Sequence, residues 1–213
     1  MEMFPMFLKL EGRACLVVGA GTIAAPKIES LLRAGARVTV VAPEAQADLR
    51  EEAAQGRIRW TPREFAAADL NGTFLVIAAT DRQPVNHAVA EEARRRGILC
   101  NSVDDPPDCD FFYPSVVRRG DLQIAISTAG KSPALAQRLR AEIDAAIEPN
   151  AGDWLDGLGE IRLRILENFA ASDARKAALH LLAQREICTP DACPVQALLR
   201  EAPRVAVTKK DDQ

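Results

Sequence analysis

The sequence predicts an α/β protein built on a Rossmann-like, doubly wound parallel sheet. Three observations support this fold class: apolar runs of strand length alternate with helical segments, glycines separate them, and the first run leads into a glycine-rich turn. Repeated strand and helix units with short connections form right-handed crossovers between parallel strands. We therefore expect a sheet with helices on both faces, followed by a hairpin-containing region and a small C-terminal helical domain.

The first half of the chain contains the predicted sheet. Its continuous apolar runs are typical of strands that are covered on both faces. We expect strands at Cys15–Gly19, Arg37–Ala42, Arg57–Trp60, Phe74–Thr80 and Ile98–Val103. Glycine follows each intervening helical segment, as at helix C-termini. We expect these helices at Thr22–Ala34, Glu44–Gln55 and Pro84–Arg96.

The pattern changes after Asp104. Two strand-like runs, Phe112–Val117 and Leu122–Ser127, are joined by Arg118–Asp121 and predict an antiparallel hairpin. Ser132 before a proline predicts the start of a helix that runs to about Ile147, and further helix is expected from Trp154 to about Arg185. We therefore expect a Rossmann domain over residues 1–111, a hairpin and helix region over 112–148, and a helical domain with a frayed tail over 149–213.

Composition narrows the function classes. A net charge of -3 over 213 residues argues against a general nucleic-acid binder or an anionic-membrane binder. No apolar stretch reaches the roughly 18 residues that a membrane helix needs, and Met1–Gly12 lacks the features of a signal peptide. We expect a cytoplasmic protein without nucleic-acid or membrane partners. The five scattered cysteines predict mostly reduced thiols rather than a disulfide framework.

The turn after the first strand carries the spacing of a dinucleotide-binding site. Gly19, Gly21 and Ala24 match the G-x-G-x-x-G/A pattern. Gly19 would permit the tight turn, Gly21 would let the backbone approach a pyrophosphate, and Ala24 would let the helix pack closely on the strand. The helix N-terminus would supply free N–H groups for the phosphate charge. Glycines after a strand also serve ordinary tight turns, so both interpretations stay open at this stage.

The end of the second strand indicates which dinucleotide binds. Pro43 ends the strand and Glu44 is the first acid after it, whereas the nearest following arginine is Arg50. An acid at this place binds ribose hydroxyls, while an arginine accommodates a 2′-phosphate, so the sequence favours NAD over NADP. The alternative is that Glu44 complements the dipole of the helix it starts.

Two further segments could carry chemistry. Asp104 and Asp105 follow a predicted parallel strand at its carboxyl end, where open α/β sheets bind ligands. The alternative, which these residues alone favour, is that aspartates before Pro106 merely shape a turn. The segment Ser127–Pro133 combines hydroxyls, a lysine and a helix N-terminus, which suits an anion, although a capped helix start explains it as well.

The histidines and cysteines do not predict a metal site. His87 and His180 stand apart from each other and from any ligand-spaced cluster, so each is expected to be a structural or surface residue. Cys188 and Cys193 are two thiols and do not complete a site, although sharing across a dimer stays open. Nothing near Cys109 marks an activated thiolate.

Taken together, five ordered motifs resemble the precorrin-2 dehydrogenase family, the module that forms the front part of siroheme synthase. The motifs are GAGTIA, VTVVAPE, FLVIAATD, NSVDDPPDCDFFYPS and ISTAGKSPALAQRLR, and the resemblance covers about Phe4–Ile147. It implies NAD-dependent oxidation of precorrin-2 to sirohydrochlorin by a homodimer whose small helical parts interlock. In some members of the family the same site also inserts ferrous iron.

The resemblance also implies site residues. The essential aspartate of the family corresponds to Asp104, our hypothetical base. Cofactor contacts are expected at Gly19, Gly21, Thr22, Ile23, Ala24, Pro43, Glu44, Ala79 and Thr80. Substrate contacts are expected at Asn101, Ser127, Thr128, Lys131 and Ser132. Candidate cations for the substrate carboxylates are Arg118, Arg119, Lys131 and Arg138, although solvated surface arginines are the commoner explanation.

Two positions depart from the family pattern. Pro26 stands where arginine is common, and a proline near the start of a helix predicts a distorted or late-starting first turn. Ala129 stands where glycine is usual, which could narrow the loop or forbid a positive φ angle.

The alternative function is a dimeric module that senses NAD without catalysis. Such a sensor needs neither the Asp104 segment nor a second, anion-lined cleft.

Overall fold

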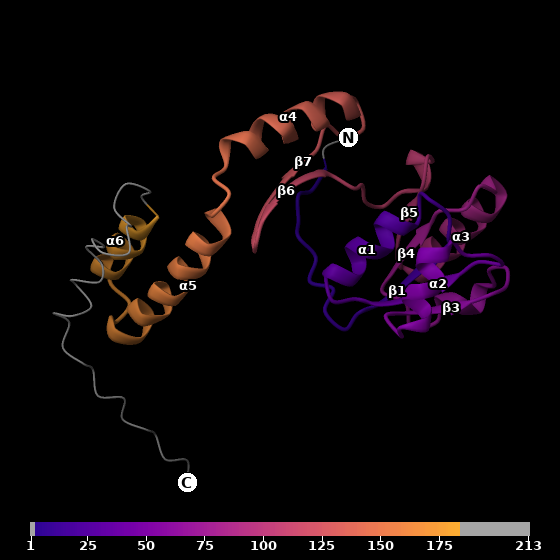
Figure 1. The fold of residues 1–213 in the computed structure, drawn as a ribbon, viewed down its shortest axis with the longest axis horizontal. Coiled ribbons are helices and arrows are strands. Elements are labelled where there is room, and N and C mark those ends of the chain that lie inside the picture. The colour runs from indigo at the N-terminus through magenta and orange to yellow at the C-terminus, as the bar shows by residue number, and fades with distance from the viewer. Residues whose placement is uncertain (1–2, 184–213) are drawn as a thin grey trace, which may run out of the picture. The chain divides into compact units, whose positions relative to one another are not determined.

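The computed structural model describes residues 3–183 and divides the chain into two compact units, Met1–Tyr113 and Pro114–Gln213. The first contains a five-stranded parallel sheet in the order β3-β2-β1-β4-β5, with helices on its faces (Figure 1). Because β1 pairs with both β2 and β4, the strand order reverses beside β1, and ligands of such sheets bind at this switch point.

The strands form where apolar residues follow one another without interruption. Buried valine, leucine and isoleucine side chains point to both faces, so both faces need cover. The strands are β1 (Ala14–Val18), β2 (Arg37–Val41), β3 (Ile58–Thr61), β4 (Leu75–Ala78) and β5 (Leu99–Ser102). The predicted parallel sheet is confirmed, and each strand ends within two residues of its predicted end.

Helices cover each face of the sheet and complete two cores. On one face, α1 (Ala25–Arg33) and α2 (Ala47–Ala54) pack against the first core. On the other face, α3 (Gln83–Arg96) and the short 3₁₀ helix η1 (Ala67–Leu70) pack against the second. Burial of these large aliphatic side chains is the main term that stabilises the unit.

The helix N-termini differ from the prediction. Helix α1 begins at Ala25 rather than Thr22, and Pro26 occupies its first turn, where no N–H is needed. The late start that Pro26 predicted is confirmed. Helix α2 begins at Ala47, so Glu44 lies in the bend before it rather than in its first turn.

The second unit begins with a hairpin. Strands β6 (Ser115–Arg119) and β7 (Leu122–Ile126) pair antiparallel, and Gly120 and Asp121 form the two-residue turn. The predicted turn at Arg118–Asp121 was therefore two residues too long, and the first strand was placed too early. Pro114 explains the shift, because proline has no N–H to donate to the pairing strand. Helix α4 (Pro133–Ala146) contacts both strands.

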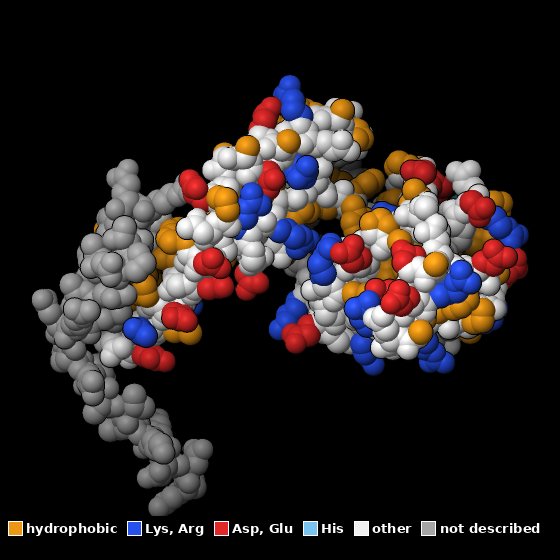
Figure 2. Space-filling view, in the orientation of Figure 1, with side chains coloured by type: hydrophobic (Ala, Val, Ile, Leu, Met, Phe, Trp, Pro, Cys, Tyr) orange, Lys and Arg blue, Asp and Glu red, His pale blue; other side chains and the backbone are white. Residues whose placement is uncertain are grey.

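Two more helices follow in this unit (Figure 1). They are α5 (Ala151–Asn168) and α6 (Asp173–Leu182), so the predicted continuous helix is broken where Ser172 caps α6. Ile165, Ala178 and Leu182 form their small core. Arg185, Cys188 and Cys193 lie outside the described residues. On the face of each unit that Figure 2 shows, charged side chains of both signs are interspersed.

Candidate functional site

The turn after β1 is closed so tightly that only glycine fits at its first position. Gly19 has a φ of 106°, and its N–H donates to the Val41 carbonyl over 2.9 Å. A Cβ atom at Gly19 would lie 2.4 Å from the carbonyl oxygen of Ala79 at the end of β4. Gly19 therefore lets the ends of β1 and β4 approach each other at the switch point.

The remainder of this turn leaves donors free. Within residues 3–183, the backbone N–H groups of Gly21, Thr22 and Ile23 have no acceptor. A Cβ atom at Gly21 would meet nothing within 4 Å, so open space lies beside these donors. Ala24 is fully buried where α1 begins, which keeps the helix close to the sheet. Free N–H groups around an unobstructed glycine fit the pyrophosphate of a dinucleotide.

The end of β4 is held by a residue that the sequence analysis missed. Asn86 of α3 is 4% exposed, its side-chain N–H donates to the Thr80 carbonyl over 3.0 Å, and its oxygen accepts from the Thr80 N–H. The Thr80 hydroxyl lies 2.7 Å from the same oxygen. Asn86 thereby fixes Ala79 and Thr80, two of the expected cofactor contacts. The available signal was an asparagine on the apolar face of a helix.

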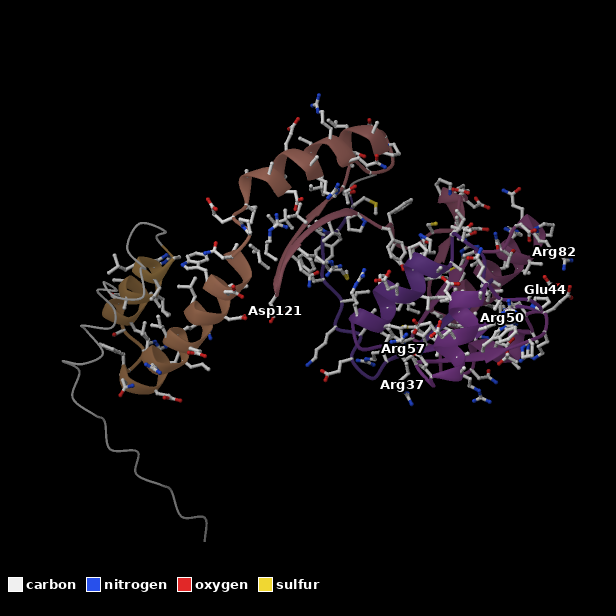
Figure 3. The ribbon with its side chains drawn as sticks, viewed as in Figure 1. Arg37, Glu44, Arg50, Arg57, Arg82 and Asp121 are labelled. Atoms are coloured by element: carbon white, nitrogen blue, oxygen red, sulfur yellow. The ribbon has the colours of Figure 1, made fainter. Side chains whose placement is uncertain are left out.

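The predicted ribose-binding acid lies at the carboxyl end of β2. Pro43 and Glu44 are both exposed there, and Glu44 has no ion pair in the part of the chain that the structure describes. Figure 3 shows Glu44, Arg50 and Arg82 on the same side of the first unit. The Arg82 guanidinium forms an ion pair with Glu64 over 2.6 Å, so this arginine is not a free cation for a 2′-phosphate.

The loop after β5 carries a strained aspartate. Asp104 is exposed and has a φ of 60°, a left-handed conformation that is uncommon outside glycine. Residues 103–104 form a turn and the short 3₁₀ helix η2 (Pro106–Asp108) follows, while the predicted role of Asp104 stays a prediction. Strained backbone of this kind costs about 1–3 kcal/mol and persists only where the surroundings impose it.

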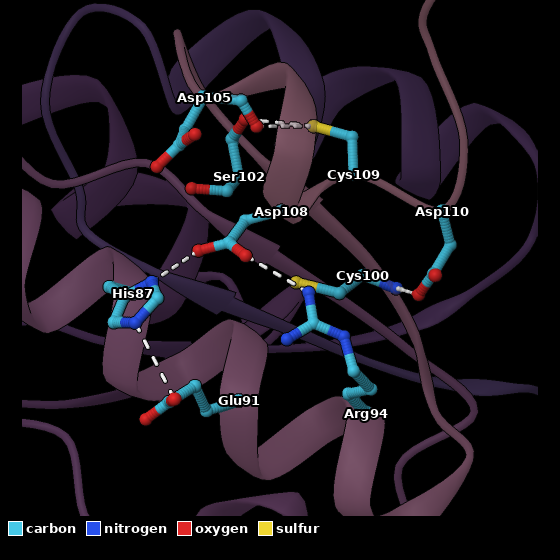
Figure 4. Close-up of polar contacts among 9 residues, drawn as sticks. All are labelled: His87, Glu91, Arg94, Cys100, Ser102, Asp105, Asp108, Cys109 and Asp110. Atoms are coloured by element: carbon cyan, nitrogen blue, oxygen red, sulfur yellow. Dashed lines mark hydrogen bonds and ion pairs between the residues drawn. The ribbon is translucent and has the colours of Figure 1, made fainter.

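Helix α3 supplies contacts that anchor the end of this loop at Asp108. Asp108 is 7% exposed and lies between His87 Nδ1 at 2.6 Å and an Arg94 nitrogen at 2.9 Å (Figure 4). The hydrogen bond from Arg94, together with the one from His87, lowers the pKa of Asp108. In turn the hydrogen bond with Asp108 raises the pKa of His87, which also lies 3.5 Å from Glu91. His87 therefore has the structural role expected of it.

Strand β5 itself supplies the other contacts. The Asn101 side chain is 6% exposed and donates to the Phe111 carbonyl over 2.8 Å. Its predicted substrate contact stays a prediction. The Cys109 thiol donates to the Ser102 carbonyl at 3.0 Å, and burial raises its pKa, so it is not an activated thiolate. Burial also raises the pKa of Cys100 to about 12.

The loop before α4 is organised by its own hydroxyls. The Ser132 side chain accepts from the Leu135 N–H, which confirms the predicted helix cap. The Ser127 hydroxyl accepts from the Ala129 N–H, and the Thr128 hydroxyl donates to the Ser132 carbonyl. Ala129 has a φ of 50°. The expectation that alanine could forbid a positive φ at this position is therefore wrong.

The candidate cations of the second unit fall into two groups. Arg119 binds Asp144 over 2.8 Å, and Arg138 lies 3.3 Å from Glu142. Arg118 and Lys131 have no carboxylate partner among residues 3–183. An anionic ligand of this unit would therefore meet Arg118 and Lys131 without displacing another ion pair.

The described part of the chain contains no group of three or more His, Cys, Asp or Glu side chains placed to hold a metal ion. His180 lies exposed on α6. None of the described helices is both long and apolar enough to cross a membrane.

Comparisons with known families agree with this geometry. A family model described as "Putative NAD(P)-binding" matches residues 6–115, and one described as "Sirohaem biosynthesis protein central" matches residues 119–146. A siroheme synthase from Photorhabdus laumondii is 41% identical over 177 residues, and one from Methylobacillus flagellatus is 44% identical over 176 residues. Each alignment covers 83% of this chain and 38% of the relative, so the chain spans well under half the length of these relatives.

A solved structure matches nearly the whole chain. It is described as "SirC, precorrin-2 dehydrogenase", with a TM-score of 0.80 and 28% identity, and the match covers 93% of this chain and 100% of that one. The family resemblance, the α/β fold class and the NAD-type cofactor that the sequence predicted are thereby confirmed.

Proposed function

This chain belongs to the family described as "Putative NAD(P)-binding", and we propose that it is an NAD-dependent dehydrogenase that oxidises precorrin-2 to sirohydrochlorin. The observation that carries the proposal is the match to the full length of SirC, a precorrin-2 dehydrogenase, at a TM-score of 0.80. The similarity to siroheme synthases supports the same pathway, siroheme biosynthesis. Both comparisons support a tetrapyrrole as the substrate class of the proposed enzyme.

The turn after β1 holds the cofactor in this proposal. The free N–H groups of Gly21, Thr22 and Ile23 bind the pyrophosphate, beside the buried Ala24. Glu44 binds the ribose hydroxyls, which its exposed and unpaired carboxylate supports. Pro43, Ala79 and Thr80 line the remaining contact at the ends of β2 and β4. The bound nicotinamide supplies a hydride acceptor.

Asp104 carries the acid–base step. Oxidation of precorrin-2 removes a hydride and a proton, and the exposed Asp104 carboxylate accepts that proton, directly or through a water molecule. The contacts of Asp108 and Asn101 hold its backbone in place. In the second unit, Ser127, Thr128, Lys131 and Ser132 bind substrate carboxylates, which the unpaired ammonium of Lys131 supports.

The protein acts as a cytoplasmic homodimer in this proposal. The hairpin supports dimerisation, because Ile124 and Ile126 of β7 stay only half-buried although α4 contacts both strands. Strand β7 alternates half-buried and exposed residues, so one of its faces is left open. Size-exclusion chromatography with light scattering would give twice the chain mass, whereas a single chain mass over the working concentration range would contradict the dimer.

An anaerobic turnover assay tests the proposed activity. Enzymatically prepared precorrin-2 is mixed with protein and NAD, or NADP in a parallel reaction, and NADH formation and the tetrapyrrole spectrum are recorded. NADH and sirohydrochlorin should appear together, with NAD preferred. NAD binding without oxidation would reject the dehydrogenase and favour the NAD-sensing module. Ferrous ion added afterwards tests for iron insertion, which would show as a rate of siroheme formation above the protein-free rate.

A further inference from the structure

Lys27 is a half-buried lysine whose ammonium has no hydrogen-bond acceptor and no carboxylate partner in the part of the chain that the structure describes. It lies in the first turn of α1, three residues after Ala24. Within residues 3–183, its Nζ atom has neither an ion pair nor a hydrogen-bond acceptor. An ammonium has three N–H donors, and removing one from water without acceptors is costly. This cost makes an external acceptor a natural complement to the site.

The ring of Tyr113 packs against this ammonium. The Lys27 nitrogen lies 4.1 Å from the centre of the Tyr113 ring, within the range of a cation–π contact. Tyr113 in turn packs against Phe111, with 6.0 Å between ring centres. The Ser30 hydroxyl donates to the Lys27 carbonyl over 2.7 Å, one turn further along α1.

Lys27 and the proposed catalytic loop share one end of the sheet. Partial burial lowers the pKa of Lys27, while the negative charge of Asp104 acts in the opposite direction. Helix α1 follows β1 and Asp104 follows β5, so Lys27 and Asp104 both lie at the carboxyl end of the parallel sheet, and no ion pair within residues 3–183 joins them. Val103 and Phe111, which flank this loop, pack against the same hydrophobic core as α1. One cation and one carboxylate thus lie at the same end of the sheet.

We propose that Lys27 binds a carboxylate of the tetrapyrrole and so positions the macrocycle beside Asp104. This inference rests on the proposed function, because the substrate must carry carboxylates. The Tyr113 ring stabilises the ammonium until the substrate carboxylate replaces the missing acceptors. A carboxylate bound at Lys27 fixes which edge of the macrocycle meets Asp104, so Lys27 is a positioning residue rather than the base.

Substitutions of Lys27 test this role through separate kinetic constants. Lys27→Met keeps the aliphatic length and removes the charge, so it should raise KM for precorrin-2 about tenfold, the size of one charge-assisted hydrogen bond. The Kd for NAD should stay unchanged, because the pyrophosphate is assigned to the turn before α1. Lys27→Arg should restore most of the lost affinity. Lys9→Met, an exposed lysine elsewhere in the unit, is the matched control.

The outcomes separate this inference from the proposed function. Titration with sirohydrochlorin in the absence of NAD reports tetrapyrrole binding even if no turnover occurs, and Lys27→Met should weaken that binding as well. A lowered melting temperature with KM and Kd unchanged would assign Lys27 a purely structural role and overturn the inference. A weakened Kd for NAD with unchanged tetrapyrrole binding would also overturn it. Absence of NADH formation by the unsubstituted protein would instead reject the dehydrogenase.

Discussion

The turn after β1 and the loop after β5 both follow strands of the same sheet, yet they are held in different ways. The turn depends on its backbone: Gly19 adopts a φ of 106° and leaves no space for a side chain beside Ala79. The loop depends on side chains: Asp108 is fixed by His87 and Arg94, and Asp104 adopts a positive φ although it carries a Cβ atom.

The difference follows from what each segment is proposed to bind. A pyrophosphate needs backbone N–H groups and close approach, which a turn of small residues provides. A proton acceptor needs one side chain in a fixed place, which demands anchors from neighbouring elements. The turn should therefore be sensitive to any added side-chain atom, whereas the loop should be sensitive to loss of its anchoring charges.

The largest effect is expected from Gly19→Ala. The new Cβ atom would lie 2.4 Å from the Ala79 oxygen, and the positive φ alone costs about 1–3 kcal/mol. Urea unfolding should show a loss at least that large, with NAD binding abolished. Gly21→Ala is the matched control, because its Cβ meets no protein atom; it should keep stability and lower NAD affinity only. Equal stability losses in both variants would contradict the assigned roles.

Asp108→Asn should separate the loop from the turn. It removes the charge that holds His87 and Arg94, so the loop should loosen and kcat should fall roughly tenfold to a hundredfold, as when a reacting group is slightly misplaced. The Kd for NAD should not change. Glu92→Gln, which removes the partner of Arg95 and Arg96 on the same helix, serves as the control. A shift in the Kd for NAD without a change in kcat would show that the two segments are not independent.

Ala129→Gly tests backbone strain in the second unit. Ala129 adopts a φ of 50°, and relieving a left-handed alanine should raise the free energy of unfolding by about 0.5–1 kcal/mol after the extra chain entropy of glycine is counted. Chemical denaturation of the full chain measures this change. Ala141→Gly, on the exposed side of α4, should have the opposite sign. If both substitutions lower the free energy of unfolding, the backbone of Ala129 is not strained.

The smallest effect is the pH dependence of the His87 contact. The hydrogen bond to Asp108 raises the folded-state pKa of His87 above its ordinary value of 6.5. The contribution of protonated His87 to the free energy of unfolding is therefore complete below its unfolded-state pKa. It is lost as pH rises through its folded-state pKa. The melting temperature of the unsubstituted protein should exceed that of His87→Gln at pH 5.5, and the gap should shrink toward pH 9. A gap that widens with pH would have the wrong sign.

The sequence predicted those parts that depend on local rules. The glycine spacing, the late helix start at Pro26 and the cap at Ser132 each follow from a few adjacent residues, and all three are present in the structure. The resemblance to a family then supplied the expected role of Asp104, which no local rule could establish.

The anchors of the site were not predictable in the same way. Asp108 and His87 are 21 residues apart, and only the folded sheet brings α3 to the loop after β5. Asn86 hydrogen-bonds Thr80, whereas the ammonium of Lys27 has no hydrogen-bond acceptor within residues 3–183. Both facts depend on tertiary packing and not on neighbouring residues in the sequence. The first strand of the hairpin was predicted to begin at Phe112, where an apolar run starts, but it begins at Ser115. Pro114 interrupts that run, because it has no N–H to donate to a pairing strand.

The most direct test of the proposed division of roles is NADH formation by Asp104→Asn at saturating NAD and precorrin-2. The account predicts that this variant binds NAD as the unsubstituted protein does but forms NADH roughly a hundredfold more slowly, the usual contribution of one general base. NADH formation at the unsubstituted rate, or loss of NAD binding, would contradict the assignment of chemistry to the loop after β5 and of the cofactor to the turn after β1.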